Sequence, residues 1–127
     1  MKVLLKYKKY SQIIFWLWLV IIIVSSSLPQ TPNLKIELKS GYIIAFDYFV
    51  HFVVYFVLAL LFFYWKSTKD FKISKKSTLL FILLGIVAGI VFETIQLYIP
   101  GRAFNINDIY ANSTGVILGV ILPRLIV

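Results

Sequence analysis

The sequence contains no cysteine and few charged residues. The lack of cysteine excludes disulfides, thiolate nucleophiles and zinc–thiolate sites. Charged residues make up only 14% of the 127 residues, whereas a typical soluble domain has about 25%. Apolar residues make up 61% of the chain, so the solvent that this composition matches is a lipid bilayer.

Long apolar runs predict an all-α membrane protein, a bundle of four transmembrane helices. A helix needs about 17–25 largely apolar residues to cross a bilayer. We expect the spans at residues 12–28, 46–65, 77–99 and 108–127. They are expected to form a single transmembrane domain over residues 1–127.

The first run follows a basic N-terminal segment and allows two interpretations. A basic segment, an apolar core and the serines at 25–27 also form the pattern of a cleaved signal peptide. We favour a retained helix, because the three later spans already make this a membrane protein. The connector at residues 29–46 is expected to be non-helical, because it contains residues that interrupt helices: Pro29, Pro32, Ser40 and Gly41.

Lysine and arginine are distributed unequally between the loops. With four spans, ten of the 13 basic residues lie on the side of the termini and the 66–76 loop, and three lie on the other side: Lys35, Lys39 and Arg102. Short loops rich in these residues face the cytoplasm, so both termini are predicted to be cytoplasmic. Orientation and attraction to anionic lipid heads explain the net charge of +8, and we expect no nucleic-acid partner.

Polar residues within the spans gather at the ends predicted to face outward. Asp47 and His51 lie in the outer half of the second span, Glu93 lies in that of the third, and Asp108 begins the fourth. Arg102 lies in the loop between the last two spans, where Pro100-Gly101 predicts a turn and Asn105 or Asn107 is expected to cap the next helix.

Helical spacing extends these positions into three stripes, each on one helix face. Two of the stripes include pairs of glycines, which let helix backbones approach closely in lipid, so the polar groups are predicted to face the interior of the bundle. The stripes are Asp47, His51 and Tyr55; Gly85, Gly89, Glu93 and Gln96; and Asp108, Asn112, Gly115 and Gly119.

The depth of Glu93 predicts a charged partner. This residue lies seven positions before Pro100, roughly 10 Å below the expected helix end at 1.5 Å per residue. An acidic side chain at the bilayer centre costs about 2.5–3.5 kcal/mol, and less at shallower depth. A cation reduces this cost, so we expect Glu93 to pair with Arg102 or His51.

The pattern of polar residues resembles that of the VanZ-like family of small bacterial membrane proteins. The matching positions are Asp47, His51, Phe52, Tyr55 and Phe56, followed by Glu93, Gln96, Arg102, Asp108, Asn112 and Gly115. Tyr48 stands where members often carry lysine, so no salt bridge is expected at that position. The resemblance implies a multi-pass protein of the cytoplasmic (inner) membrane that acts at the cell envelope. The family is named for an accessory protein of resistance to glycopeptide antibiotics, linked to teicoplanin.

One interpretation of the polar cluster is an outward-facing pocket that binds or acts on an amphipathic envelope molecule. Membrane lipids, a lipid-linked cell-wall precursor or a lipoglycopeptide are the expected partners. Arg102 would hold a phosphate or carboxylate through its fork of donors. The other predicted binding residues are Gln96, Asp108, Asn112 and Tyr55.

Catalysis in this pocket would depend on acid–base or metal chemistry, because the chain has no serine or cysteine nucleophile motif. His51 would be the general acid or base, oriented by Asp47, and Glu93 the second proton-transfer group. These three are the catalytic candidates, and the sequence does not decide whether the protein is an enzyme. A divalent metal on Asp47, His51, Glu93 and Asp108 is a further alternative, but no typical ligand spacing supports it, so we assign no metal or cofactor.

Three other interpretations remain open. The polar groups can act as glue between helices at about 0.6–2 kcal/mol per contact, in a scaffold without catalysis. A transporter or proton relay would need polar residues in the inner halves of the spans, and residues 58–63 and 116–123 supply none. An adaptor for a larger partner is the third possibility.

Overall fold

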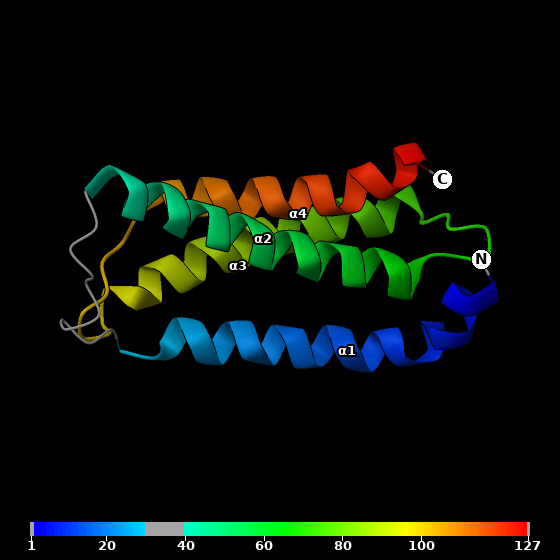
Figure 1. Ribbon diagram of the computed structural model, residues 1–127, viewed down its shortest axis with the longest axis horizontal. Helices are drawn as coiled ribbons and strands as arrows, with labels where there is room; N and C mark the ends of the chain where they lie inside the picture. The colour runs from blue at the N-terminus through cyan, green and yellow to red at the C-terminus, as the bar shows by residue number, and fades with distance from the viewer. Residues whose placement is uncertain (1, 30–39, 127) are drawn as a thin grey trace.

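A computed structural model describes residues 2–29 and 40–126, and this part of the chain is all-helical (Figure 1). Its helices are α1 (Lys2–Ser27), α2 (Ser40–Lys66), α3 (Lys75–Gln96) and α4 (Ile106–Ile126). Each contains a helical segment of at least 18 residues that is long and apolar enough to cross a membrane. The predicted all-α architecture with four candidate transmembrane helices is therefore confirmed for the described residues, and it indicates a multi-pass membrane protein.

The helices do not begin and end where the apolar runs do. α1 begins ten positions before the expected span, at Lys2, and α2 begins at Ser40. The expectation that Ser40 and Gly41 interrupt the helix is wrong, because both residues are tolerated at a helix start. α3 ends at Gln96, three residues earlier than expected. Hydropathy predicts which residues lie inside the bilayer, whereas a helix is defined by its backbone hydrogen bonds. These bonds begin in polar sequence in α1, and in α3 they stop before the apolar run ends.

The most extensive helix contact joins α2 and α4. A Cβ atom on Gly115 would lie 2.5 Å from the Phe52 carbonyl oxygen, and one on Gly119 would lie 2.6 Å from Ala59 Cβ. The two backbones are therefore so close that only glycine fits at these positions. α3 packs on the other side of α4, where Gly85 faces Val116.

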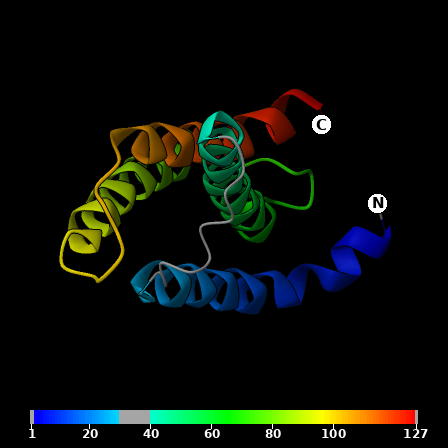
Figure 2. The same cartoon turned by 60° about the vertical axis from the view of Figure 1, so that its left-hand side comes forward.

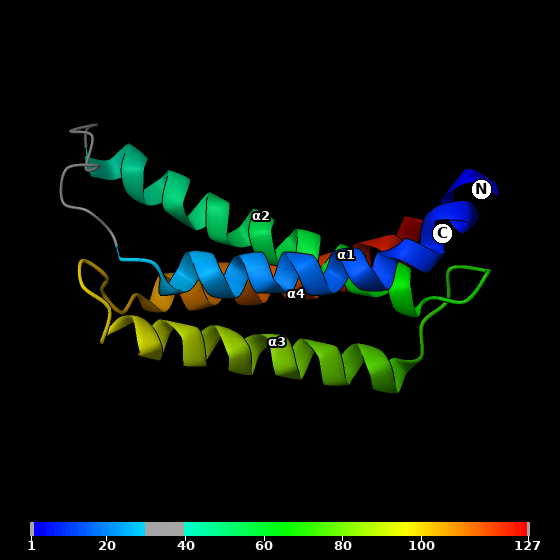
Figure 3. The same cartoon turned by 90° about the horizontal axis from the view of Figure 1, so that it is seen from below.

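α1 lies along one side of the other three helices (Figures 2 and 3). It packs mainly against α2 and hardly touches α3. Phe15 and Ile22 are its buried apolar residues, and the Trp18 indole N–H donates a hydrogen bond to the Val54 carbonyl at 3.0 Å. α1 is thus attached to the bundle through α2 rather than surrounded by it.

The start of α1, the loop between α2 and α3 and the end of α4 lie at one end of the bundle (Figure 1). Two basic side chains hold this end together: Lys8 donates to the Ser67 carbonyl, and Arg124 donates to the Ile73 carbonyl at 2.7 Å. This arrangement agrees with an even number of crossings. That this end is cytoplasmic stays a prediction, and the connector residues Lys35 and Lys39 lie outside the described part of the chain.

The turn between α3 and α4 lies at the opposite end. Gly101 adopts a positive φ of 75°, and the Arg102 N–H donates to the Ile99 carbonyl at 3.1 Å. Asn105 caps α4, because its side-chain oxygen accepts from the Asn107 N–H at 3.1 Å. Both the predicted turn and the predicted cap are confirmed, and together they fix the position of Arg102 near α1.

Candidate functional site

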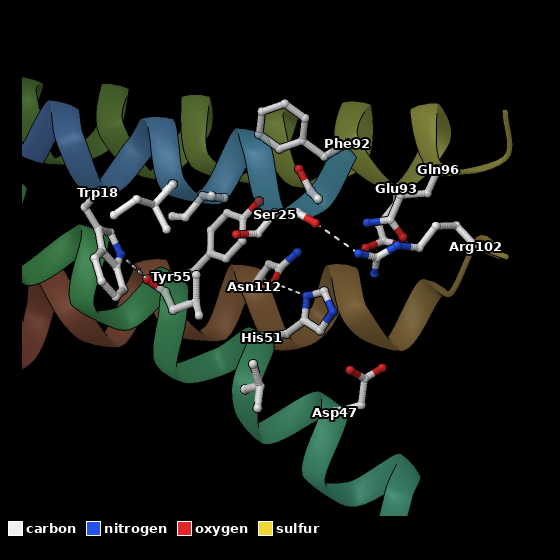
Figure 4. Close-up of a pocket in the computed structure, with 15 residues that line it drawn as sticks. Trp18, Ser25, Asp47, His51, Tyr55, Phe92, Glu93, Gln96, Arg102 and Asn112 are labelled. Carbon is white, nitrogen blue, oxygen red and sulfur yellow. Dashed lines mark hydrogen bonds between the residues drawn. The ribbon is translucent and has the colours of Figure 1, made fainter. Parts of the chain in front are cut away.

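A cavity of about 240 Å³ lies near the α3–α4 turn, with walls from all four helices (Figure 4). Its apolar walls come mainly from α1 and α2. Its polar wall consists of Asp47, His51, Glu93, Gln96, Arg102 and Asn112. Four of these side chains are ionisable, those of Asp47, His51, Glu93 and Arg102, which is a concentrated group in a chain with so few charged residues.

His51 is held by two residues of α4. Its Nδ1 lies 3.0 Å from the Asn112 side-chain oxygen, and its Nε2 lies 3.6 Å from an Asp108 carboxylate oxygen. An amide oxygen can only accept a hydrogen bond, so Nδ1 carries the proton that is donated to Asn112. The imidazole orientation therefore depends on α4, and the expectation that Asp47 orients His51 is wrong.

Asp47 lies close to both His51 and Asp108. Ligand atoms of Asp47, His51 and Asp108 all lie within 4.8 Å of one another. One imidazole nitrogen and two carboxylates can hold a divalent cation such as Mn²⁺, which accepts both nitrogen and oxygen ligands. Glu93, which the sequence placed in the same ligand set, does not belong to this group within the described residues.

Glu93 has a backbone partner instead of a cation. Its side chain is 1% exposed, and one carboxylate oxygen accepts from the Asn105 N–H at 3.3 Å. The Asn105 side chain also donates to Asp108 at 3.3 Å, so one loop residue contacts two carboxyl groups of the site. Among the described residues, the contact within 4.0 Å between a basic side-chain nitrogen and a carboxylate is that of His51 with Asp108. The predicted pairing of Glu93 with Arg102 or His51 is therefore wrong.

Arg102 connects the α3–α4 turn to the end of α1. Its Nε donates to the Leu28 carbonyl at 3.1 Å, and one terminal nitrogen donates to the Ser25 carbonyl at 3.0 Å (Figure 4). A guanidinium has five N–H donors, so part of the group remains available to a ligand. The guanidinium fork, which the sequence suggested would hold a phosphate or carboxylate, points two of its nitrogens at the C-terminal end of α1.

The remaining predicted residues also lie at this cavity. Gln96 and Asn112 are buried parts of its wall, and Tyr55 lines its apolar side. Asp108 contacts His51, is 5% exposed and lies next to the cavity rather than in its wall. The structure thus brings every predicted site residue to one place, and their roles in binding or catalysis stay predictions.

Several residues of the site were not predicted. α1 contributes Trp18 and Ser25, and α3 adds Phe92. An indole N–H in an apolar span needs a partner, which is the signal that could have placed Trp18 in the interior. No comparable signal shows that the Asn105 backbone contacts Glu93, because that contact depends on how the loop folds back over α3.

Comparison with known proteins identifies the family. The family model described as VanZ/LLP1 matches residues 8–127. An uncharacterized protein of Schizosaccharomyces pombe is 29% identical over 106 residues, which cover 84% of this chain and 59% of the yeast protein. The chain thus spans less than two thirds of that relative, and no solved structure matches it. With nearly all of its residues matched by the family model, the chain belongs to the VanZ/LLP1 family.

Proposed function

We propose that the protein binds the polar head of an amphiphilic membrane molecule in the cavity between its helices. The observation that carries this proposal is the polar wall itself, which combines Asp47, His51, Glu93 and Arg102 at the end of an apolar bundle. Ionisable residues within membrane spans are functional candidates by default.

The alternative role as interhelical glue fits the contacts less well. Glue would bring the charged groups into direct contact, and the expected pairing of Glu93 with Arg102 or His51 is not made. The one hydrogen bond to Glu93 is worth about 0.6 kcal/mol on average between membrane helices. Burying a carboxyl in a span costs up to about 2.5–3.5 kcal/mol. His51 contacts Asp108, but Glu93 and Arg102 line the cavity and, among the described residues, form no ion pair within 4.0 Å, which favours a ligand.

The wall chemistry indicates the type of head group. The carboxyl groups of Asp47 and Glu93 supply hydrogen-bond acceptors, the carboxamides of Gln96 and Asn112 supply both acceptors and donors, and Arg102 supplies donors. A cavity of 240 Å³ corresponds to roughly eight water molecules at about 30 Å³ each. We infer a small head whose groups can both donate and accept hydrogen bonds, such as the hydroxyl groups of one sugar.

Proton transfer is compatible with this site. With Nδ1 of His51 donating to Asn112, Nε2 is the nitrogen left for proton exchange, either with a bound molecule or with Asp108 at 3.6 Å. Asp47 and Glu93 remain the other catalytic candidates. No nucleophile lines the cavity in a motif that would support a covalent intermediate, so acid–base chemistry is the reaction type that these residues support.

The cellular role follows from the ligand class. In a bacterial inner membrane, an outward-facing site for an amphiphile would act on envelope lipids, a lipid-linked wall precursor or a lipoglycopeptide, and would contribute to resistance of the teicoplanin type. The likeness to a yeast protein favours a glycolipid over a wall precursor, because yeasts do not build the bacterial wall.

The test compares head groups on one chain. The purified protein in detergent micelles is titrated calorimetrically with amphiphiles that share an alkyl chain and carry a glucose, phosphate or choline head. We expect the glucose head to bind tightest. Gln96→Ala should weaken that binding about five- to tenfold, because it removes hydrogen bonds worth about 1 kcal/mol.

Gln12→Ala is the matched control, because Gln12 is exposed on α1 and the chemical change is identical. Its affinity should equal that of the parent. Equal affinity for all heads, unchanged by Gln96→Ala, would contradict a head-binding cavity. If the variants at Gln96 and Glu93 lose accumulation in membranes in step with binding, the polar cluster is structural glue.

A further inference from the structure

A second cavity of about 350 Å³ lies between α1, α2 and α3. Its walls are aromatic and aliphatic, apart from Lys66 at one end. Ile22, Tyr55 and Phe92 belong to the walls of both this cavity and the polar one. The two cavities therefore adjoin, and together they form one site with a polar end and an apolar end.

The apolar cavity runs along α2 from Tyr55 to Trp65. These two positions are ten residues apart, which corresponds to about 15 Å at 1.5 Å per residue. The hydrocarbon core of a bilayer is about 30 Å thick, so this length matches the depth of the hydrocarbon in one leaflet. A chain attached to a head in the polar cavity would extend from Tyr55 toward the loop between α2 and α3.

The apolar cavity is open between α1 and α3, the two helices that form its side walls. α1 and α3 hardly touch each other, while each is long and apolar enough to cross the membrane. What lies beside these helices is therefore hydrocarbon and not water. A membrane molecule can reach the site sideways, without leaving the bilayer.

The far end of the cavity is defined by packed aromatic rings. Phe62 and Phe81 stack with ring centroids 3.8 Å apart, and Phe15 lies against Trp65 at 5.3 Å. The Lys66 ammonium lies 4.2 Å from the Trp65 ring centroid. Rings that hold one another in place give the cavity a fixed outline, which suits one narrow hydrocarbon chain.

We propose that the apolar cavity holds one hydrocarbon chain of the molecule whose head occupies the polar cavity, and that this molecule enters from the bilayer between α1 and α3. This inference rests on the proposed function and narrows the ligand to an amphiphile that can place a single acyl or prenyl chain along α2. Lipid chains are as apolar as leucine, so the chain adds little affinity. Its position, rather than its effect on affinity, is the property to measure.

The experiment locates the chain by fluorescence quenching. Three proteins with a single tryptophan are prepared in unbrominated lipid: one retains Trp65, one retains Trp18, and a control carries only Leu79→Trp. Leu79 is 70% exposed on α3 near the same end of the bundle as Trp65. An alkyl glucoside with bromine near the head or at the chain end is then added as a minor component.

Bromine at the chain end should quench Trp65 at least twofold more than the Leu79→Trp control, and bromine near the head should quench Trp18. Quenching of Trp18 with no excess at Trp65 would overturn the chain position and leave head binding intact. Absence of excess quenching at both tryptophans would overturn the proposed function as well. The two failures are thus distinguishable.

A blocking variant provides an independent readout. Ala88 lines the apolar cavity, so Ala88→Phe should abolish the excess quenching of Trp65 by bromine at the chain end. Val87→Phe is the control, because Val87 is 47% exposed on α3 and does not line the apolar cavity. Thermal unfolding confirms that both variants fold. Undiminished quenching in Ala88→Phe would contradict the proposal.

Discussion

The close approach of α2 and α4 at Gly115 makes a sharp prediction about stability. In Gly115→Ala the new Cβ atom would lie 2.5 Å from the Phe52 carbonyl oxygen and 2.9 Å from the Phe56 nitrogen, whereas ordinary van der Waals contact begins at 3.4 Å. Both neighbours are backbone atoms, which cannot rotate away. The helices must therefore separate, and a variant that keeps the original spacing is not possible.

The expected cost exceeds the gain in helix propensity. Overpacking costs about 1–3 kcal/mol, and replacing glycine by alanine within a helix returns at most about 1 kcal/mol. We expect a net loss of stability for Gly115→Ala. At Gly89 a new Cβ would lie 3.7 Å from its nearest neighbours on Asn112, so Gly89→Ala is the matched control and should be neutral or slightly stabilising.

Unfolding in mixed detergent micelles by titration with sodium dodecyl sulfate measures both variants. The midpoint should fall for Gly115→Ala and stay equal or rise for Gly89→Ala. Separation of α2 from α4 should also disturb the hydrogen bond between His51 and Asn112, and the nitrogen chemical shifts of the single histidine report on it. A Gly115→Ala protein as stable as Gly89→Ala would refute the close helix contact.

Two further substitutions test how α1 is attached. Arg102→Gln removes the donors to Ser25 and Leu28, so amide hydrogen exchange should accelerate severalfold at the end of α1 and stay unchanged in α4. Protection equal to the parent would contradict this tether. Trp18→Phe removes the donor to Val54 and should lower the unfolding free energy by roughly 0.6–1.7 kcal/mol. A matched Trp16→Phe change, at a residue that is 50% exposed, should have a smaller effect, and equal effects would contradict the role of the indole hydrogen bond.

The convergence of the polar residues was predictable because charges are so rare in the spans. Asp47 and Glu93 each interrupt an apolar run and Asp108 begins one, and the order of the spans places all three at one end. The glycine stripe of α4 was predictable from its spacing, because Gly115 and Gly119 are four positions apart. These signals are local in sequence and need only helical periodicity to be read.

The partners within the site were not predictable in the same way. Sequence reasoning pairs opposite charges, which led to Glu93 with Arg102. In the structure the backbone of Asn105 contacts Glu93, while Arg102 is drawn to carbonyls at the end of α1. The contact of Asn105 with Glu93 depends on the path of the turn, and the contacts of Arg102 join segments that are distant in sequence. Backbone groups carry no side-chain signal, so periodicity and charge counts cannot indicate them.

The contribution of α1 was also missed. Residues 13–24 of this helix are apolar on every face, and a span of this kind is expected to contact lipid on most of its surface. The structure shows that one side of α1 completes both cavities, through Trp18 at the polar cavity and Phe15 at the apolar one. If the first span were a cleaved signal peptide, the mature protein would lack this wall.

The central claim is that one amphiphile occupies both cavities, and mass spectrometry of lipids that co-purify from native membranes tests it most directly. The parent protein should retain one amphiphile at a level above its share of the bulk membrane. Gln96→Ala should lose that enrichment, and Gln12→Ala should keep it. Recovery of lipids in their bulk membrane proportions from all three proteins would contradict the account.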